Sequence, residues 1–356
     1  YPLFDSPRPN FWNNQELTLR FDQEIELSGR RGLRTQSAEA GVSVAEAGFQ
    51  DVRRRLEFSV RSAYFAVVLA KADLEAARGA LDEIDKVIGL NRARYQQGEI
   101  SGGELRRIQV ERLKFVDDVF AAVLALRNGR GALLSLLNAT NLGVEFDVTE
   151  TLSPGDRLAG TGGPVAPPPP ALDPVSLRSQ ALAARPDLLA AQREVQRVDT
   201  ETALQRALRT PNITVGGGYR RDFGSNAVVF GVTVPLPVAS RNQGGLARVA
   251  AERRLAGNAA IAIATGVLLD VQQAVNAVEI NRSRVQYIER EYLTNARESR
   301  DIILAAYRLG TADLIDFLDA QRAFRDTART YNRALYEERI STFALAAAIG
   351  APSNQP

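Results

Sequence analysis

The sequence predicts a mainly α-helical protein with a membrane β-barrel. Long α-helical hairpins would form an α-barrel, and four β-strands per protomer would contribute to a trimeric twelve-strand barrel. Three observations lead to this fold class. The 356-residue chain repeats one structural unit, each copy contains an unusually long helix without proline, and the first predicted strand is apolar on one side and charged on the other.

The internal repeat is visible in short motifs. A Tyr-x-x-Gly motif followed by a glutamine occurs twice, and an alternating segment with Leu19 and Phe21 aligns with Phe230 and Val232 at an offset of 211 residues. One structural unit therefore occurs in two copies. The first motif, at an offset of 212, consists of Tyr95, Gly98 and Gln109 in one copy and Tyr307, Gly310 and Gln321 in the other.

The first predicted element is a strand at residues 17–27, where apolar and polar side chains alternate and Gln23 is the single exception. Two further strands are predicted in the second copy, at residues 212–219 and 228–238. Residues 220–226 separate them and are rich in turn-forming residue types, so these two strands form a hairpin.

Each copy next contains a very long helix. Residues 33–97 lack proline and are rich in Ala, Arg, Glu and Leu, so about 65 residues can be helical, which corresponds to roughly 100 Å. Residues 246–309 also lack proline, are of nearly the same length and have apolar residues spaced three and four positions apart, so they are predicted to form a second long helix. Helices of this length have no core of their own, so they must pack on each other as in coiled coils.

The strands indicate a membrane. An amphipathic strand taken alone more often forms one wall of a soluble sandwich. Here the other residues are committed to long helices, so nothing is left to cover an apolar sheet face. Strands of about ten residues with one apolar side are typical of outer-membrane barrels. Unpaired strand edges are not tolerated in lipid, so three chains with four strands each are predicted to close a twelve-strand barrel.

The repeat also predicts what lies outside the sequence. The second copy opens with a helix at residues 174–208 and a strand, and their counterparts would fall largely before residue 1. We therefore expect the first helix and strand to be missing, and residues 1–14 to be the loop that follows that strand. Between the copies, residues 153–174 form a Pro/Gly-rich linker, either a belt around the helical body or a disordered tether.

The predicted domain organisation follows this order along the chain. Outer-membrane strands lie in residues 1–29 and 210–240, the first periplasmic helical hairpin in 30–150, the equatorial inter-repeat linker in 151–174, the helix that opens the second repeat in 175–209, the second periplasmic hairpin in 241–350, and a C-terminal tail in 351–356.

Composition excludes several classes of function. The net charge is only +2, with 44 basic and 42 acidic residues interspersed, which is not the footprint of a nucleic-acid-binding protein. The chain has no His, Cys or Met, so any metal site must use oxygen ligands. The same absence, together with the lack of a Gly-rich phosphate loop, predicts no enzyme and no cofactor. No run of 18 apolar residues predicts a transmembrane helix, and no signal peptide begins at Tyr1.

Several motifs resemble those of a known family. Residues 184–188 (ARPDL) resemble a helix-opening motif, residues 231–237 (GVTVPLP) a strand-to-helix junction, and residues 307–310 (YRLG) leading into 318–321 (LDAQ) a hairpin tip. In this order, and with the duplication, they resemble outer-membrane efflux proteins of the TolC type, closest to the heavy-metal efflux branch. The resemblance implies a homotrimer in the outer membrane of a Gram-negative bacterium, with a helical body in the periplasm.

The resemblance also implies a gate at the periplasmic entrance, formed by Tyr307, Asp316 and Asp319. The two aspartates share a helix face, and threefold symmetry would make each a ring of three carboxylates that attracts cations. Such a ring could hold a hard divalent cation. The structural alternative is a solvated helix face beside a tyrosine that packs on a glycine turn. The sequence departs from some family members at Ala312, where they carry an arginine.

The predicted function is a passive exit duct in a tripartite efflux system for metal cations or small organic compounds. The family implies a periplasmic adaptor that docks at the tips around Tyr95, Gly98, Tyr307 and Gly310, and an inner-membrane pump of the RND type. Outer-membrane lipid is the remaining partner. Two alternatives stay open: a soluble periplasmic coiled-coil scaffold or adaptor protein, and a duct for type I protein secretion.

Overall fold

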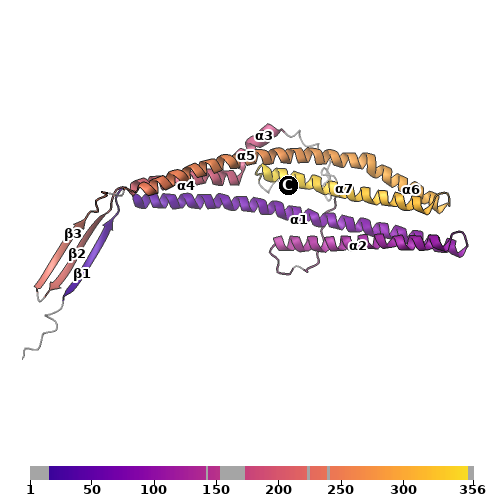
Figure 1. The fold of residues 1–356 in the computed structure, drawn as a ribbon, viewed down its shortest axis with the longest axis horizontal. Coiled ribbons are helices and arrows are strands. Elements are labelled where there is room, and N and C mark those ends of the chain that lie inside the picture. The colour runs from indigo at the N-terminus through magenta and orange to yellow at the C-terminus, as the bar shows by residue number, and fades with distance from the viewer. Residues whose placement is uncertain (1–15, 142, 153–172, 223–224, 239–240, 352–356) are drawn as a thin grey trace, which may run out of the picture. The chain divides into compact units, whose positions relative to one another are not determined.

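The computed structural model describes residues 16–141, 143–152, 173–222, 225–238 and 241–351 (Figure 1). The predicted loop at residues 1–14 and the linker up to residue 172 lie outside these described residues, as does most of the C-terminal tail. Two compact units divide the chain, and the division crosses both long helices instead of following the linear domain order. The first unit holds Tyr1–Phe49 and Pro186–Ala264, and the second holds Gln50–Arg185 and Thr265–Pro356.

The sheet has three antiparallel strands in the order β1-β2-β3: β1 (Leu17–Ile25), β2 (Ile213–Asp222) and β3 (Ser225–Thr233). The hairpin turn is shorter than residues 220–226, because Arg220 and Arg221 are paired in the β2–β3 ladder. The third strand also ends at Thr233 and not at residue 238, since Pro235 and Pro237 have no N–H for a ladder. The fourth predicted strand lies outside the described residues.

The sheet carries no covering layer in the described part of the chain. Every residue of β1 and β3 is exposed, including the apolar side chains of Phe21 and Phe230. These two rings flank Gly217 in the middle strand, in direct register. An apolar sheet face of this kind needs a partner that the described part of one chain does not supply.

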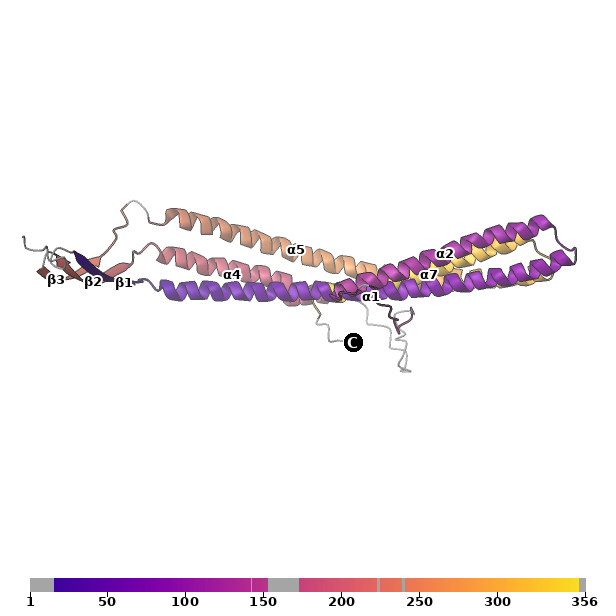
Figure 2. The ribbon, with the colours of Figure 1, turned by 90° about the horizontal axis from the view of Figure 1, so that it is seen from below.

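Helix α1 (Arg30–Gln96) is continuous over 67 residues, which confirms the first long helix. It begins after Ser28 and Gly29, both with positive φ, and ends before Gly98. In the first unit α4 (Pro186–Ala207) lies between α1 and α5 (Gln243–Tyr287), as Figure 2 shows. The guanidinium of Arg193 donates to the Ser43 carbonyl at 2.8 Å and joins α4 to α1.

The second long helix contains a π-helical turn that the sequence did not predict. Helix α5 runs into the π-helix η1 (Ile288–Leu293), which runs into α6 (Thr294–Arg308). Buried Val67 and Leu74 of α1 correspond to buried Val278 and Val285 of α5 at an offset of 211, whereas the tip motifs differ by 212. An i→i+5 turn holds one residue more than an α-turn, so η1 accommodates this additional residue.

The helix predicted at residues 174–208 is broken in two. Helix α3 (Pro174–Ala184) ends at Arg185, whose ψ of 123° is extended, and α4 begins with Pro186. Proline has no N–H and disfavours the α conformation in the residue before it, which accounts for the break. Arg185 is buried and forms an ion pair with Asp270 at 2.7 Å.

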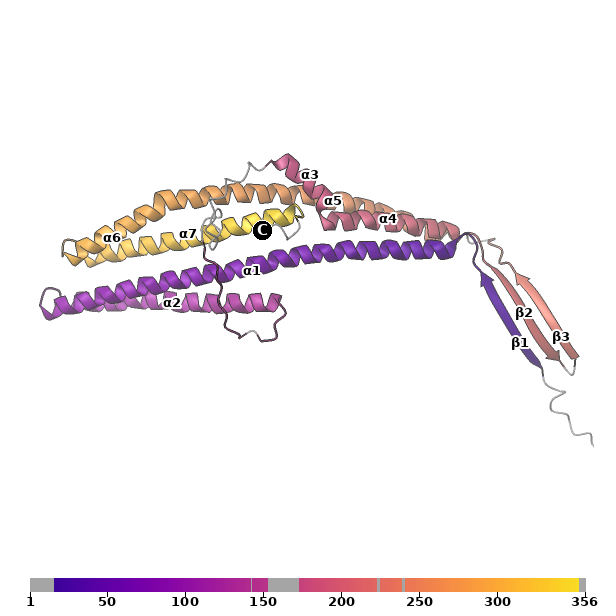
Figure 3. The ribbon, with the colours of Figure 1, turned by 180° about the vertical axis from the view of Figure 1, so that it is seen from behind.

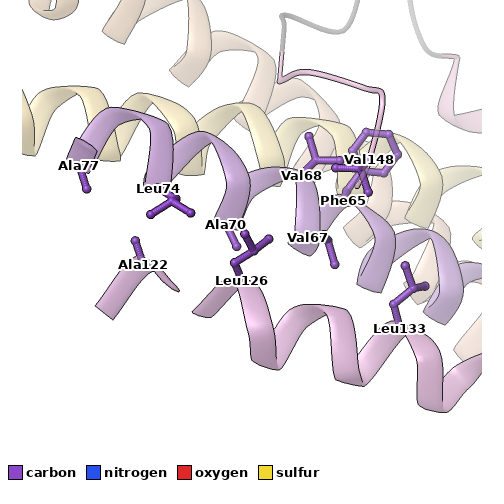
Figure 4. Packing of buried hydrophobic residues seen from close by; sticks show 10 residues of the cluster. All are labelled: Phe65, Val67, Val68, Ala70, Leu74, Ala77, Ala122, Leu126, Leu133 and Val148. Atoms are coloured by element: carbon purple, nitrogen blue, oxygen red, sulfur yellow. The ribbon is translucent and has the colours of Figure 1, made fainter. Parts of the chain in front are cut away.

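In the second unit the hairpin of α6 and α7 (Leu314–Ala348) packs on the hairpin of α1 and α2 (Gly102–Leu136), with α6 in contact with α1, and α7 in contact with both α1 and α2 (Figures 1 and 3). Hydrophobic clusters hold these helices together. The first joins α1 to α2 and is drawn in Figure 4: Phe65, Val67, Val68, Ala70, Leu74, Ala77, Ala122, Leu126, Leu133 and Val148. The second lies near the hairpin ends and contains Ile84, Val87, Ile88, Ile108, Phe115, Leu304, Tyr307, Leu314, Phe317 and Leu318.

Candidate functional site: the two hairpin tips

Both predicted docking tips are built on the same helix-ending motif. The N–H of Gly98 donates to the Tyr95 carbonyl at 3.1 Å, and the N–H of Gly310 donates to the Tyr307 carbonyl at the same distance. The residue after each glycine bonds back to the carbonyl five positions earlier, at 2.9 Å in both copies. This is a Schellman motif, and both glycines have the φ of +79° that it requires. The repeated glycine is thus explained by backbone geometry.

The helices that leave the two tips also begin alike. In α2 the Ser101 hydroxyl accepts from the Glu104 N–H at 3.2 Å, and the Glu104 carboxylate accepts from the Ser101 N–H at 3.0 Å. In α7 the Asp316 carboxylate accepts from the Asp313 N–H at 3.4 Å. Asp316 therefore occupies the capping-box position that Glu104 has in the first copy, which gives it a structural role in addition to its charge.

The two candidate gate aspartates lie on the exposed surface at the start of α7. Asp316 and Asp319 are both exposed and three positions apart, so they share a face of the helix. Asp319 forms an exposed ion pair with Arg322 at 3.3 Å. Among the described residues of one chain, no group of three or more acidic side chains is placed to hold a metal ion. A carboxylate ring at these positions therefore requires other chains.

Tyr307 is buried within the chain. Its hydroxyl donates to the Asn91 Oδ1 at 2.7 Å, and its ring stacks on Phe317 with centroids 5.7 Å apart. Only 5% of the residue is exposed. Burial raises the pKa of the Tyr307 hydroxyl above its ordinary value, and the hydrogen bond to Asn91 opposes that shift. The side chain thus joins α6 to α1 and does not project from the tip of this chain.

Tyr95, at the equivalent position of the first copy, is half exposed. Its ring lies beside Gly102, where an added Cβ would come within 3.4 Å of the ring. The equivalent of Gly102 in the second copy is Leu314, which is buried. The same sequence motif therefore gives one tyrosine locked between helices and one that is available at the surface.

Sequence reasoning missed two residues of this site, Asn91 and Arg94 of α1. The Arg94 guanidinium lies 5.5 Å from the centroid of the Tyr307 ring and donates to the carbonyls of Tyr307 and Arg308 at 3.2 and 2.8 Å. An arginine therefore does reach this tip, although Ala312 replaces the one expected from the family. Asn91 could have been noticed, because it is a polar residue at helical spacing from buried Ile84, Val87 and Ile88.

A cavity of about 630 Å³ lies between α1 and the α6–α7 hairpin. Small residues of α1, such as Ala76 and Ala80, form one wall. The other walls are rich in arginine, including Arg325 and Arg329, which both form ion pairs with Asp118 of α2 at 2.9 and 2.8 Å. Around this cavity the packing between the two hairpins of one chain is therefore polar and incompletely filled, whereas the apolar cluster near the hairpin ends joins the same two hairpins.

Comparison with known proteins decides the family. A model of the family "Outer membrane efflux protein" matches residues 8–138 and 177–351. The chain belongs to the outer membrane efflux protein family. This efflux protein is similar to the cobalt-zinc-cadmium resistance protein CzcC of Cupriavidus metallidurans, with 26% identity over 307 residues, 86% of this chain and 70% of that protein. It is also similar to the pyoverdine export outer membrane protein OpmQ of Pseudomonas putida, with 25% identity over 94% of this chain and 70% of that protein.

Solved structures show the same fold. CusC superposes with a TM-score of 0.76 and 18% identity, over 95% of this chain and 78% of that chain. The CmeC outer membrane channel of Campylobacter jejuni superposes with a TM-score of 0.74 and 16% identity, over 94% and 71% of the two chains. The predicted fold class, with an α-barrel and a β-barrel, is that of these channels.

The family membership settles several predictions. The efflux protein is a channel of the outer membrane with its helical body in the periplasm, and it is not an enzyme. The resemblance to TolC-type outer-membrane efflux proteins is confirmed. A soluble coiled-coil scaffold, the first alternative, is wrong for a member of this family.

Proposed function

We propose that three copies of this efflux protein form the passive exit duct of a tripartite efflux system for metal cations or small organic compounds. The uncovered sheet carries this proposal. All residues of β1 and β3 are exposed in one chain, and a sheet in lipid must be closed because unpaired backbone groups cannot be buried without water. A closed barrel shared by three chains would place the exposed apolar side chains in lipid and leave no strand edge unpaired.

In this proposal other proteins determine the direction of transport, because a passive duct has no energy source of its own. An inner-membrane pump of the RND type drives the solute, and a periplasmic adaptor couples it to the hairpin tips. Exposed side chains at both tips support docking there, namely Tyr95 in the first copy and Leu309, beside Gly310, in the second.

Asp316 and Asp319 form the gate of the duct in this proposal. Both carboxylates are exposed, and threefold symmetry turns them into two stacked rings of three acidic groups. Such rings concentrate cations at the entrance and offer oxygen ligands to a hard divalent cation. Tyr307 contributes indirectly, since its hydrogen bond to Asn91 holds the hairpin that carries the aspartates against α1.

The relatives support small solutes as the substrates. One is named for resistance to cobalt, zinc and cadmium, and the other for export of pyoverdine, so a metal-ion substrate and an organic substrate both occur among similar chains. Neither name refers to protein secretion, the second alternative that the sequence raised. The chain has no thiol, imidazole or thioether, so metal ions would pass without being chelated by soft ligands.

The gate is tested by neutralising both aspartates. Asp316→Asn with Asp319→Asn keeps side chains of similar size and preserves an acceptor for the Asp313 N–H. In planar bilayers we expect the variant to lose cation selectivity and block by millimolar Mg²⁺. Glu104→Gln with Arg107→Gln alters the equivalent positions of the first copy and should change neither property. Unchanged selectivity in the aspartate variant would remove these residues from the gate, and the absence of channels in the unaltered protein would refute the duct itself.

A further inference from the structure

The cavity between α1 and the α6–α7 hairpin has the size of a small-molecule site. Its volume of about 630 Å³ lies within the range of roughly 300–1,000 Å³ that is typical of ligand pockets. Small and apolar side chains line much of this space: Ala76, Ala77, Ala80, Leu304, Phe324 and Ala328. The cavity thus offers apolar surface to a ligand much larger than a water molecule.

A buried glutamine lines this cavity without a hydrogen-bonding partner. Gln321 is only 2% exposed, and its amide forms no hydrogen bond within the part of the chain that the structure describes. Buried amides are ordinarily hydrogen-bonded, because leaving one unsatisfied costs free energy. The equivalent Gln109 of the first copy is exposed, so water can serve as its partner. The Gln321 amide therefore requires a partner that enters the cavity.

Helices α6 and α7 supply positive charge to the cavity. Arg325 and Arg329 share one carboxylate, that of Asp118. The Nε of Arg325 lies 3.5 Å from the Asp326 carboxylate but is buried without a hydrogen bond. Arg308 also lines the cavity and forms no ion pair with any described residue. Guanidinium groups bind carboxylates through parallel N–H donors, so an anion here would satisfy donors that the chain leaves open.

A flat stack of side chains also borders the cavity. The guanidinium of Arg300 lies 4.2 Å from the centroid of the Phe324 ring, and an ion pair with Asp301 at 2.5 Å compensates its charge. Guanidinium groups are planar and stack on aromatic faces, so this stack suits a ligand with a flat ring. The cavity therefore combines open donors for an anion with surfaces for a planar apolar body.

The acidic side chains of α1 decide where the anionic end of a ligand lies. Asp82 and Glu83 line the cavity on α1, and both pair with Lys86, at 2.7 and 2.9 Å. Two carboxylates that share one cation disfavour a further anion beside them. The anionic end is therefore expected at Arg308 and Arg325, on the side of α6 and α7.

The cavity belongs to the periplasmic body of the protein and not to the membrane. Helix α2 and the continuous α5–α6 helix each contain a window that is long and apolar enough to cross a membrane, contrary to the sequence expectation. The helical body of this family is nevertheless periplasmic, so water and not lipid surrounds the cavity. The ligand is therefore a solute of the periplasm and not a lipid chain.

We propose that this cavity binds an amphipathic organic anion with a flat apolar body, of the chemical class of the aromatic carboxylates. Arg308, Arg325 and the amide of Gln321 hold the carboxylate, and the ring packs between the small side chains of α1 and the stack of Arg300 on Phe324. Such a ligand contacts α1, α6 and α7 at once and ties the α6–α7 hairpin to α1. In the proposed duct this hairpin carries the gate aspartates, so the ligand favours the arrangement described here over one that separates the hairpins.

Equilibrium dialysis of radiolabelled cinnamate against the detergent-solubilised protein tests the site. We expect saturable binding above the non-saturable uptake by detergent micelles. Arg308→Gln removes one anion donor and should weaken binding by about fivefold or more. Arg297→Gln is the matched control and should change binding by less than about twofold, because Arg297 is exposed on the same helix and does not line the cavity. Neutral cinnamyl alcohol and inorganic phosphate should each compete poorly, since each offers only half of the required chemistry.

A second variant, Ala328→Leu, enlarges a side chain into the cavity without altering its charges and should abolish the saturable binding. With cinnamate at about ten times its dissociation constant, we expect amide hydrogen exchange in residues 300–308 to slow by about tenfold, and only in proteins that keep the site.

Absence of saturable binding, binding that neither Arg308→Gln nor Ala328→Leu weakens, or binding that leaves this exchange unchanged would each overturn the inference. Neither measurement requires a channel. The proposed duct is judged separately, by conductance in planar bilayers, so the two proposals can fail independently.

Discussion

The two hairpin tips share one backbone and differ in what surrounds it. Both end in a Schellman turn with a glycine at φ +79°, but Tyr307 is 5% exposed and Tyr95 is 50% exposed. The difference comes from the neighbouring helix. Asn91 and Arg94 hold Tyr307, whereas the repeat places Ile303 and Ala306 at their equivalent positions in the second copy. Duplication therefore preserves the turn, whereas contacts with α1 lock the Tyr307 tip within its own chain.

Removing the tyrosine hydroxyls should expose this difference most strongly. Tyr307→Phe deletes the hydrogen bond to Asn91 and leaves the Oδ1 of that buried residue without a donor, at a cost of about 1–3 kcal/mol. We expect amide hydrogen exchange in residues 300–312 to accelerate by about one to two orders of magnitude. Tyr95→Phe should leave exchange in residues 88–100 within about a factor of two, because its hydroxyl forms no such buried contact. Equal effects of the two substitutions would contradict the asymmetry.

Alkaline titration measures the burial of the Tyr307 hydroxyl directly, and the expected effect is smaller. Burial raises the pKa of Tyr307, so folding favours its neutral form. That contribution is fully present below about pH 10, the ordinary tyrosine value, and is lost as the pH rises through the higher folded value. The hydrogen bond to Tyr292 also raises the pKa of Tyr287, so the experiment uses a Tyr287→Phe background. In that background Tyr307→Phe should remove a late component of the tyrosinate absorbance, and survival of that component would assign it to another residue.

Much of the architecture could be predicted from periodicity. The absence of proline in residues 33–97 predicts α1 almost at its observed ends, and the alternation at residues 17–27 predicts β1, which ends earlier, at Ile25. The break at Arg185 was missed although Pro186 signals it, because the apolar pattern continues on both sides of the proline. The π-turn η1 was missed because one additional residue in a continuous helix of 66 residues leaves the composition almost unchanged. Only the change of offset from 211 to 212 indicates it.

The candidate site was harder to predict than the fold. Asp316 and Asp319 can be placed on an exposed helix face from their spacing alone. The burial of Tyr307 depends on Asn91, which is 216 positions away in the chain, and no local pattern connects the two residues. Likewise, the spacing of Val110, Leu113, Phe120 and Leu124 in α2 resembles that of an ordinary buried helix face, but the described part of the chain leaves all four side chains exposed.

The central claim is that three chains pool their strands and helical hairpins into one duct. The most direct measurement is the protein mass of the purified, detergent-solubilised particle by light scattering, with the detergent contribution subtracted. The account predicts three chains per particle and precipitation when detergent is withdrawn. A particle of one chain that stays dissolved in plain buffer would contradict it.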